Sequence, residues 1–283
     1  MIDQSRLKKI KLVVFDLDGT LLNKYAQIGE ESIELVHKLK SMGVRFSFAS
    51  GRLHNALVDY ATTLGLESPL ISLDGTIIKS HPDKKIIYES YIKDAYVKKA
   101  INMANDNFLK IALCHDEAVY YTPKDAMMLE LLGKYESRFE EIESYDDDHI
   151  TKTLEFIVAG DLKEPVKAIE EKMKFPSSFG LRTSFYKSQS EEGVYFLEVR
   201  NKKCSKGLGL IRLNKHLKIS IKETAVMGDW YNDRSMFETK ALKIAVANAV
   251  EKIKGMSDYV TERTNNEDAA AEFLAMLLKA KKA

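Results

Sequence analysis

The stretch that decides the fold reads LVVFDLDGTLL and runs from Leu12 to Leu22. It opens with four apolar residues, a short run that is typical of a strand buried on both faces of a parallel sheet. Two acids follow at Asp16 and Asp18, and Gly19 then allows a sharp turn and the close approach of a ligand to the backbone. Because ligands bind at the carboxyl ends of strands in open α/β sheets, we expect Asp16 to lie where chemistry takes place.

The composition limits the kinds of protein that this chain can be. Its 283 residues, 45% of them hydrophobic, are enough for a sizeable core and more than one domain. A net charge of +1 provides no overall field that would attract nucleic acid or a membrane surface. The two cysteines, Cys114 and Cys204, lack the spacing of metal ligands and favour a reducing compartment. Since the start of the chain resembles no signal peptide and no apolar run reaches membrane-spanning length, we expect a soluble, cytoplasmic protein.

Alternating strands and helices at both ends of the chain predict a doubly wound parallel sheet. In the first part, helices are predicted at residues 30–42 and 53–64, and strands at residues 44–49 and 69–72. From about residue 200 the alternation returns, with a helix that has Ser205 as its N-cap, strands at residues 224–227, 243–246 and 259–261, and a last helix from about residue 268. Strand–helix–strand order with short connections is typical of a Rossmann-like α/β core.

The middle of the chain follows a different pattern. Strands are predicted at residues 86–88, 108–114, 118–121, 154–158, 181–186 and 194–199, and helices at residues 94–105, 124–139 and 164–174. Several of these strands alternate polar and apolar residues, as half-exposed antiparallel strands do. We therefore expect an inserted α+β domain over residues 85–198, between two parts of the core domain at residues 1–84 and 199–283. The acidic run at residues 145–149 is interpreted as a solvated loop.

Six polar residues are expected to meet at the carboxyl ends of the core strands or at the start of a helix. They are Asp16, Asp18, Ser50, Lys206, Asp229 and Asp233. Carboxylates that share a site raise one another's pKa unless a cation lies among them. A few oxygen ligands suit Mg²⁺, and no histidine or cysteine cluster competes for a softer metal. Ser50, the backbone N–H groups next to it and Lys206 supply the donors and the charge that a phosphoryl group requires.

A metal, an anion clamp and a free carboxylate together predict phosphoryl transfer. Asp16 can attack phosphorus in line and form an aspartyl-phosphate. Asp18 can protonate the leaving oxygen and then activate the water that cleaves this intermediate. Positioning, together with neutralisation of charge by Mg²⁺ and Lys206, lowers the barrier.

Four motifs carry a resemblance to a known family. They are Asp16-x-Asp18-Gly19-Thr20, Ala49-Ser50-Gly51-Arg52, Ser205-Lys206-Gly207 and Gly228-Asp229-x-x-Asn232-Asp233. In their order and spacing the chain resembles the haloacid dehalogenase-like (HAD) superfamily, and within it the Cof-type phosphatases of class IIB. That branch carries a large α+β cap after the third core strand. The resemblance covers nearly the whole chain and implies a HAD core with a cap over residues 85–198 that determines substrate specificity.

The resemblance also implies a role for each matching residue. Asp16 is the expected nucleophile, and Asp18 the expected general acid and base. Ser50, Gly51 and Lys206 are expected to bind the phosphoryl group. The expected metal ligands are Asp16, Asp18 through its backbone carbonyl, and Asp229, with Asn232 and Asp233 as further ligands or as neighbours of ligands.

The segment Asp74-Gly75-Thr76 looks like a second D-G-T motif, but Ser72 stands where its leading acid would be. We interpret it as a tight turn, with a supporting place at the rim of the site left open. Relatives often carry Asn-Gly-Ala at these positions, so the chain departs here from the pattern that it resembles.

The interpretation that accounts best for these residues is a Mg²⁺-dependent phosphatase. Its substrate is expected to be a small phosphorylated metabolite, such as a sugar phosphate, and its intermediate an aspartyl-phosphate. A phosphomutase uses the same nucleophile but returns the phosphoryl group. A phosphorylatable signalling module also joins acids, Ser or Thr and Lys on an α/β sheet, but Asp18 and the inserted domain argue against it. We expect no nucleic-acid and no membrane partner.

Overall fold

The computed structural model describes residues 2–125, 138–188 and 193–283, which fold into two compact units. The first unit comprises Met1–Gly51, Leu57–Tyr88 and Ser205–Ala283, and the second comprises Arg52–Ala56 and Glu89–Cys204. Apart from the short segment Arg52–Ala56, the chain leaves the first unit after Tyr88 and re-enters it at Ser205, whereas the sequence pattern puts these boundaries after residues 84 and 198.

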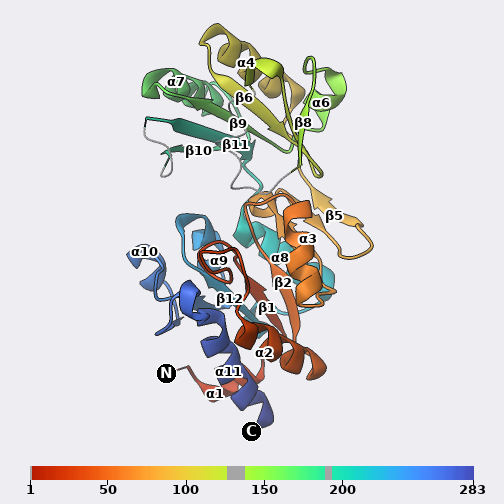
Figure 1. Cartoon of the computed structure of the whole chain (residues 1–283), viewed down its shortest axis with the longest axis vertical. Coiled ribbons are helices and arrows are strands. Elements are labelled where there is room, and N and C mark those ends of the chain that lie inside the picture. Colours follow the sequence, from red (N-terminus) through yellow and green to blue (C-terminus); the bar gives the residue numbers. More distant parts are fainter. Residues whose placement is uncertain (1, 126–137, 189–192) are drawn as a thin grey trace. The chain divides into compact units, whose positions relative to one another are not determined.

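A five-stranded parallel sheet forms the centre of the first unit (Figure 1). Its strands lie in the order β14 (Tyr259–Val260), β13 (Leu242–Ala245), β12 (Thr224–Gly228), β1 (Leu12–Phe15) and β2 (Arg45–Phe48). Phe15, the last residue of β1, is in register with Met227 on one side and Phe48 on the other. Parallel neighbours require crossover connections, which here contain helices. The predicted α/β class is confirmed.

Capping residues mark the end of α2 and the start of α8 in this unit. α2 (Glu30–Ser41) is followed by Gly43, whose positive φ of +85° suits the end of a helix. α8 (Lys206–Leu217) begins after Ser205, whose Oγ accepts the N–H of Leu208 at 3.2 Å. The other α-helices are α1 (Gln4–Lys8), α3 (Asn55–Thr63), which the division between the units crosses, α9 (Arg234–Phe237), α10 (Glu251–Lys254) and α11 (Ala269–Lys282). Short 3₁₀ turns lie at η4 (Ile221–Glu223), η5 (Tyr231–Asp233) and η6 (Asn265–Glu267).

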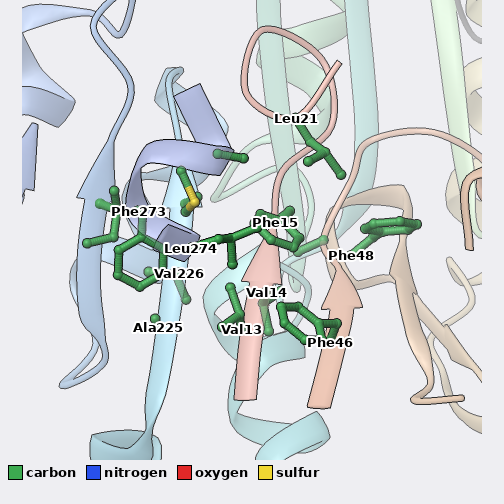
Figure 2. Close-up of a cluster of buried hydrophobic side chains, with 14 of the residues drawn as sticks. Val13, Val14, Phe15, Leu21, Phe46, Phe48, Ala225, Val226, Phe273 and Leu274 are labelled. Atoms are coloured by element: carbon green, nitrogen blue, oxygen red, sulfur yellow. The ribbon is translucent and has the colours of Figure 1, made fainter. Parts of the chain in front are cut away.

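Apolar side chains from the sheet and from α11 fill the core of the first unit (Figure 2). Phe15 on β1 and Phe46 on β2 stack with their ring centroids 6.0 Å apart. β12 adds Val226, and α11 adds Phe273 and Leu274. Burying one such side chain stabilises the fold by roughly 1.5–3 kcal/mol. This packing fixes β1, β2 and β12 in register and so fixes where the residues after them lie.

The strand predicted at residues 69–72 is present as β3 (Leu70–Ser72), but it meets the parallel sheet only at the end of β2 and also pairs with a strand that was not predicted. β3 pairs antiparallel with β4 (Ile77–Lys79), and with β5 (Ile86–Glu89) they form a three-stranded sheet. A parallel bridge between Ala49 and Ile71 links this sheet to the end of β2. The chain reverses at η1 (Leu73–Gly75), so the residues that follow it pair back onto β3.

A six-stranded sheet forms the centre of the second unit. Its order is β10 (Leu181–Lys187), β11 (Tyr195–Asn201), β9 (Glu155–Gly160), β6 (Lys110–Cys114), β7 (Val119–Tyr121) and β8 (Phe139–Glu141). The paired strands run antiparallel except β7 and β8, which run parallel. α4 (Asp94–Asp106) and α7 (Lys163–Met173) pack on this sheet, with Val97 and Val166 in the shared core. This is the α+β arrangement that the sequence predicts for the middle of the chain.

One local prediction in this unit lies mostly outside the described residues, and another differs from the structure. Residues 126–137 of the helix predicted at 124–139 lie outside the described residues; η2 (Pro123–Asp125) precedes them, and Phe139 begins β8. The solvated-loop prediction for residues 145–149 is wrong, because α6 (Asp147–Thr151) starts there. Asp146 Oδ1 accepts the backbone N–H of His149 at 2.9 Å, and an aspartate N-cap followed by acids favours a helix start. In the ranges that the structure describes, no helix is long and apolar enough to cross a membrane.

Candidate active site

Asp16 and Asp229 follow two neighbouring strands at the same edge of the parallel sheet. The backbone N–H of Asp16 continues the ladder of β1 by donating to the carbonyl of Met227 on β12 at 3.0 Å. Because β1 and β12 run parallel and in register, the residues that follow them emerge side by side. Both carboxylates are nearly buried, at 5% and 7% exposure. The sequence-based expectation that these strand ends lie next to each other therefore agrees with the geometry.

Lys206 ties the start of α8 to these strand ends. Its side chain is fully buried, although lysine is rarely so unless it is paired. Nζ donates to Asp16 Oδ1 at 2.5 Å and to Asp233 Oδ1 at 2.7 Å. The N-cap at Ser205 sets where α8 begins, and this fixes the first helical residue, Lys206, opposite the end of β1.

Asp233 organises the loop that follows β12. Its Oδ2 accepts the backbone N–H groups of Asp229 at 2.9 Å and Trp230 at 3.0 Å, while Oδ1 binds Lys206. Gly228 is required at this turn, because a Cβ there would lie 2.6 Å from Asp233 Oδ2. The carboxylate therefore shapes its own loop and holds the lysine.

Thr20 and Gly19 hold Asp229 from the other side. The hydroxyl of Thr20 donates to Asp229 Oδ1 at 2.8 Å, and the threonine is buried. Gly19 has a φ of +78°, and a Cβ on it would lie 2.5 Å from Asp229 Oδ2. Thr20 stands in the first motif but has no role among the sequence-based expectations, although a hydroxyl next to a turn of acids is a signal that could have suggested one.

Burial and mutual repulsion shift the pKa values of the acids of this site. Burial, together with the negative charges of Asp233 and Asp229, raises the pKa of Asp16 well above its ordinary value, although Lys206 opposes the shift. Burial and Asp233 raise the pKa of Asp229 to about 6. Burial by itself would lower the pKa of Lys206, but the carboxylates of Asp16 and Asp233 outweigh it and raise that pKa. The site thus holds more negative charge than one ammonium neutralises, which is the condition that favours a cation.

The other residues that were predicted for the site, Asp18, Ser50, Gly51 and Asn232, differ in burial and in hydrogen bonding. Asp18 is exposed, and its side chain is not part of the group formed by Asp16, Asp229 and Asp233. Ser50 is buried at the end of β2, but its backbone N–H donates to the carbonyl of Ile71 at 3.0 Å and so is already used. Gly51 is partly exposed. Asn232 is exposed, and its amide donates to Asp74 Oδ1 at 3.3 Å.

Asn248 also lies at this edge, although it is not among the residues predicted for the site. It follows β13, and its Nδ2 donates to the carbonyl of Gly19 at 2.8 Å. Its Oδ1 accepts the N–H of Asn265 at 2.9 Å. Applying the strand-end rule to the strand predicted at residues 243–246 would have pointed to it.

Known hydrolases and phosphatases match this chain over nearly its whole length. The family model described as haloacid dehalogenase-like hydrolase matches residues 13–274. Phosphatase YwpJ of Bacillus subtilis (strain 168) is 28% identical, over 95% of this chain and 100% of its own. A solved haloacid dehalogenase-like hydrolase from Bacteroides thetaiotaomicron is 26% identical over 94% of this chain and 98% of its own, with a TM-score of 0.82. The solved subclass IIB sugar phosphatase BT4131 shares the fold, with 20% identity over 94% of this chain and 98% of its own and a TM-score of 0.75.

Proposed function

The chain belongs to the haloacid dehalogenase-like hydrolase family, as its motifs predict, and we propose that it acts with Mg²⁺ on a small phosphorylated metabolite such as a sugar phosphate. Its enzyme class is that of the phosphoric monoester hydrolases. The observation that carries this proposal is the buried ammonium of Lys206 bound to both Asp16 and Asp233, with Asp229 beside them. A buried cation among carboxylates is suited to the oxygens of a phosphoryl group. The inserted second unit is proposed as the cap that determines substrate specificity.

In the proposed first step, a carboxylate oxygen of Asp16 attacks phosphorus in line. Lys206 binds Oδ1 of Asp16 at 2.5 Å, and Oδ2 is the oxygen that we propose for the attack. As the bond from phosphorus to the metabolite's oxygen breaks, Asp18 gives its proton to that oxygen. The exposure of Asp18 at the same strand end supports this role. The step yields the free alcohol of the metabolite and an aspartyl-phosphate on Asp16.

In the proposed second step, water cleaves this intermediate. Asp18, now ionised, accepts a proton from the water whose oxygen attacks phosphorus. The bond between phosphorus and Asp16 breaks, inorganic phosphate leaves and the carboxylate of Asp16 is restored. Lys206 compensates negative charge on the oxygens in both steps, and because it is already in place, little reorganisation is needed.

The residues of the site fit a Mg²⁺ ion in donor type and in charge. Asp16, Asp229 and Asp233 each offer a carboxylate oxygen, and these atoms lie within 4.8 Å of one another. The oxygens of Asp233 already accept Lys206 and two backbone N–H groups. We therefore propose Asp16 and Asp229 as ligands, and Asp233 as the residue that holds Lys206. The backbone carbonyl of Asp18 is a further proposed ligand, which the family resemblance implies. When bound, Mg²⁺ supplies positive charge that stabilises the transferring phosphoryl group.

Phosphate release provides the test. A panel of sugar phosphates and an activated aryl phosphate is assayed with and without Mg²⁺, using the wild-type chain and Asp16→Asn. We expect turnover that requires Mg²⁺ and a loss of about 10⁴-fold or more in the variant, because a nucleophile is removed. Asp59→Asn, which removes an exposed carboxylate on α3, is the matched control and should retain turnover.

The same assay separates the proposal from its alternatives. Free inorganic phosphate indicates hydrolysis, whereas an isomeric phosphate ester without phosphate release indicates a phosphomutase. A phosphorylated chain that persists for minutes indicates a signalling module. A wild-type chain that releases no phosphate from any substrate would contradict the proposal.

A further inference from the structure

Three successive residues between β3 and β4 have left-handed backbone conformations. Their φ values are 45° for Leu73, 48° for Asp74 and 90° for Gly75. Gly75 must lack a side chain, because a Cβ there would lie 2.3 Å from the carbonyl oxygen of Ser205. A branched residue such as Leu73 rarely adopts this conformation, and such strain persists only where surrounding contacts impose it. The strained turn therefore fixes the position of Asp74.

Asp74 contacts both loops of the candidate active site that carry phosphate-binding and metal-binding motifs. Its backbone N–H donates to the carbonyl of Ser50 at 2.9 Å. Its carboxylate lies over Gly51, with Oδ1 3.5 Å from where a Cβ on that glycine would be. The same Oδ1 accepts Nδ2 of Asn232 at 3.3 Å. One side chain thus connects the loop after β2 with the loop after β12.

We propose that Asp74 is a positioning residue that orients the amide of Asn232 toward a bound Mg²⁺ or toward its water ligands. This inference rests on the proposed function, because it assigns a role at the same site. From the sequence, Asp74 is expected in a tight turn, with a supporting place at the rim of the site left open.

The chemistry of the pair decides the orientation. An ionised carboxylate can only accept hydrogen bonds, so the amide must turn its NH₂ group toward Asp74. Its oxygen, the atom that can bind a cation or accept from a metal-bound water, is then turned away from Asp74. An asparagine at position 74 would offer both a donor and an acceptor, and the orientation of Asn232 would no longer be enforced.

Calorimetric titration with Mg²⁺ alone tests this role without turnover. The proteins compared are the wild-type chain, Asp74→Asn, Asn232→Ala and the double variant. Asparagine accepts a left-handed backbone, so Asp74→Asn is expected to keep the turn. We expect about tenfold weaker Mg²⁺ binding in Asp74→Asn, the size of effect typical of groups that orient metal ligands. Asn232→Ala should weaken binding to a similar extent.

The double variant gives the decisive comparison. If Asp74 acts through Asn232, adding Asp74→Asn to Asn232→Ala should weaken Mg²⁺ binding no further. Asp59→Asn controls for the loss of one negative charge in the same unit and should bind as the wild type does. Asp74→Gly, which also accepts the left-handed conformation, replaces Asp74→Asn if that variant fails to fold.

The outcomes separate this inference from the proposed function. Equal affinity of the wild type and Asp74→Asn, or losses that add in the double variant, would overturn the inference and leave the phosphatase proposal intact. A wild-type chain that binds Mg²⁺ but releases no phosphate would overturn the proposed function, and the calorimetric cycle would still decide the role of Asp74.

Discussion

Lys206 and Asp16 lie 190 positions apart in the chain, yet Nζ of the lysine is 2.5 Å from Oδ1 of the aspartate. The lysine is fully buried and the aspartate nearly so. An isolated buried charge costs several kcal/mol, so each group is tolerated only because the other is present. The second bond of the lysine, to Asp233, joins the end of β1, the start of α8 and the loop after β12 at one point.

Replacing Lys206 with methionine should destabilise the first unit. The variant leaves the carboxylates of Asp16 and Asp233 buried without their cation, which costs roughly 3–5 kcal/mol of unfolding free energy. Urea unfolding at pH 7.5, followed by the fluorescence of Trp230, measures this, because Trp230 is the only tryptophan and lies in the first unit. Lys215→Met, on the exposed face of α8, should change stability by less than about 0.5 kcal/mol. Equal stability of the two variants would contradict the role of the buried pair.

Replacing Gly19 with alanine should lower phosphate release, in addition to the loss of stability that backbone strain causes. A Cβ on Gly19 meets Asp229 Oδ2 at 2.5 Å, whereas Gly43 has a similar φ of +85° and no atom within 4 Å of its Cβ position. Both substitutions should cost roughly 1–2 kcal/mol in stability. Only Gly19→Ala should also lower phosphate release, by about 10²-fold, because Asp229 is displaced. Comparable turnover in Gly19→Ala and Gly43→Ala would show that the close approach to Asp229 does not matter.

Replacing Thr20 with valine should raise the pKa of Asp229 above about 6. The hydroxyl of Thr20 stabilises the ionised form of that carboxyl by donating to it at 2.8 Å. Valine has nearly the same shape and lacks the donor. Mg²⁺ binding measured at pH 6 should weaken by about tenfold, since a hydrogen bond to a charged group contributes roughly 1.5–3 kcal/mol. Thr20→Ser retains the hydroxyl and should bind nearly as the wild type does; a loss of the same size in both variants would assign the effect to packing.

Mg²⁺ should stabilise the protein more at pH 7.5 than at pH 5. In the metal-free fold the pKa of Asp229 is raised from 3.8 to about 6. A raised carboxyl pKa contributes stability that is present below pH 3.8 and is lost as the pH rises through about 6. Above that pH the ionised site is the least stable without a cation and gains most from one. Saturating Mg²⁺ should raise Tm by about 5 °C at pH 7.5 and by clearly less at pH 5.

The control for this pH dependence is Asp229→Asn. The variant should be at least as stable as the wild type without Mg²⁺ at pH 7.5, and Mg²⁺ should leave its Tm unchanged. A Mg²⁺-induced shift of Tm that is the same at both pH values in the wild type would disprove the link to Asp229.

Local patterns in the sequence predicted the framework of the site. The apolar run before Asp16, the N-cap at Ser205 and the strand before Asp229 each depend on neighbouring residues, and each is found as predicted. Because parallel strands end at one edge of a sheet, their order also placed Asp16 near Asp229. The loop predicted around Asp146 did not hold, since Asp146 starts a helix; the strand predicted at residues 69–72 is found, but it meets β2 through one parallel bridge and also pairs with β4.

By itself, then, the sequence determined the α/β class, the family and the acids at the strand ends, because periodicity, caps and motif spacing are properties of short segments. Only the tertiary structure decided how these groups are connected. That Lys206 is buried between Asp16 and Asp233, that Thr20 holds Asp229, and that Asp74 reaches Asn232 depend on contacts between segments far apart in the chain. Hydrogen bonds of this kind are set by packing in three dimensions, which no local pattern encodes.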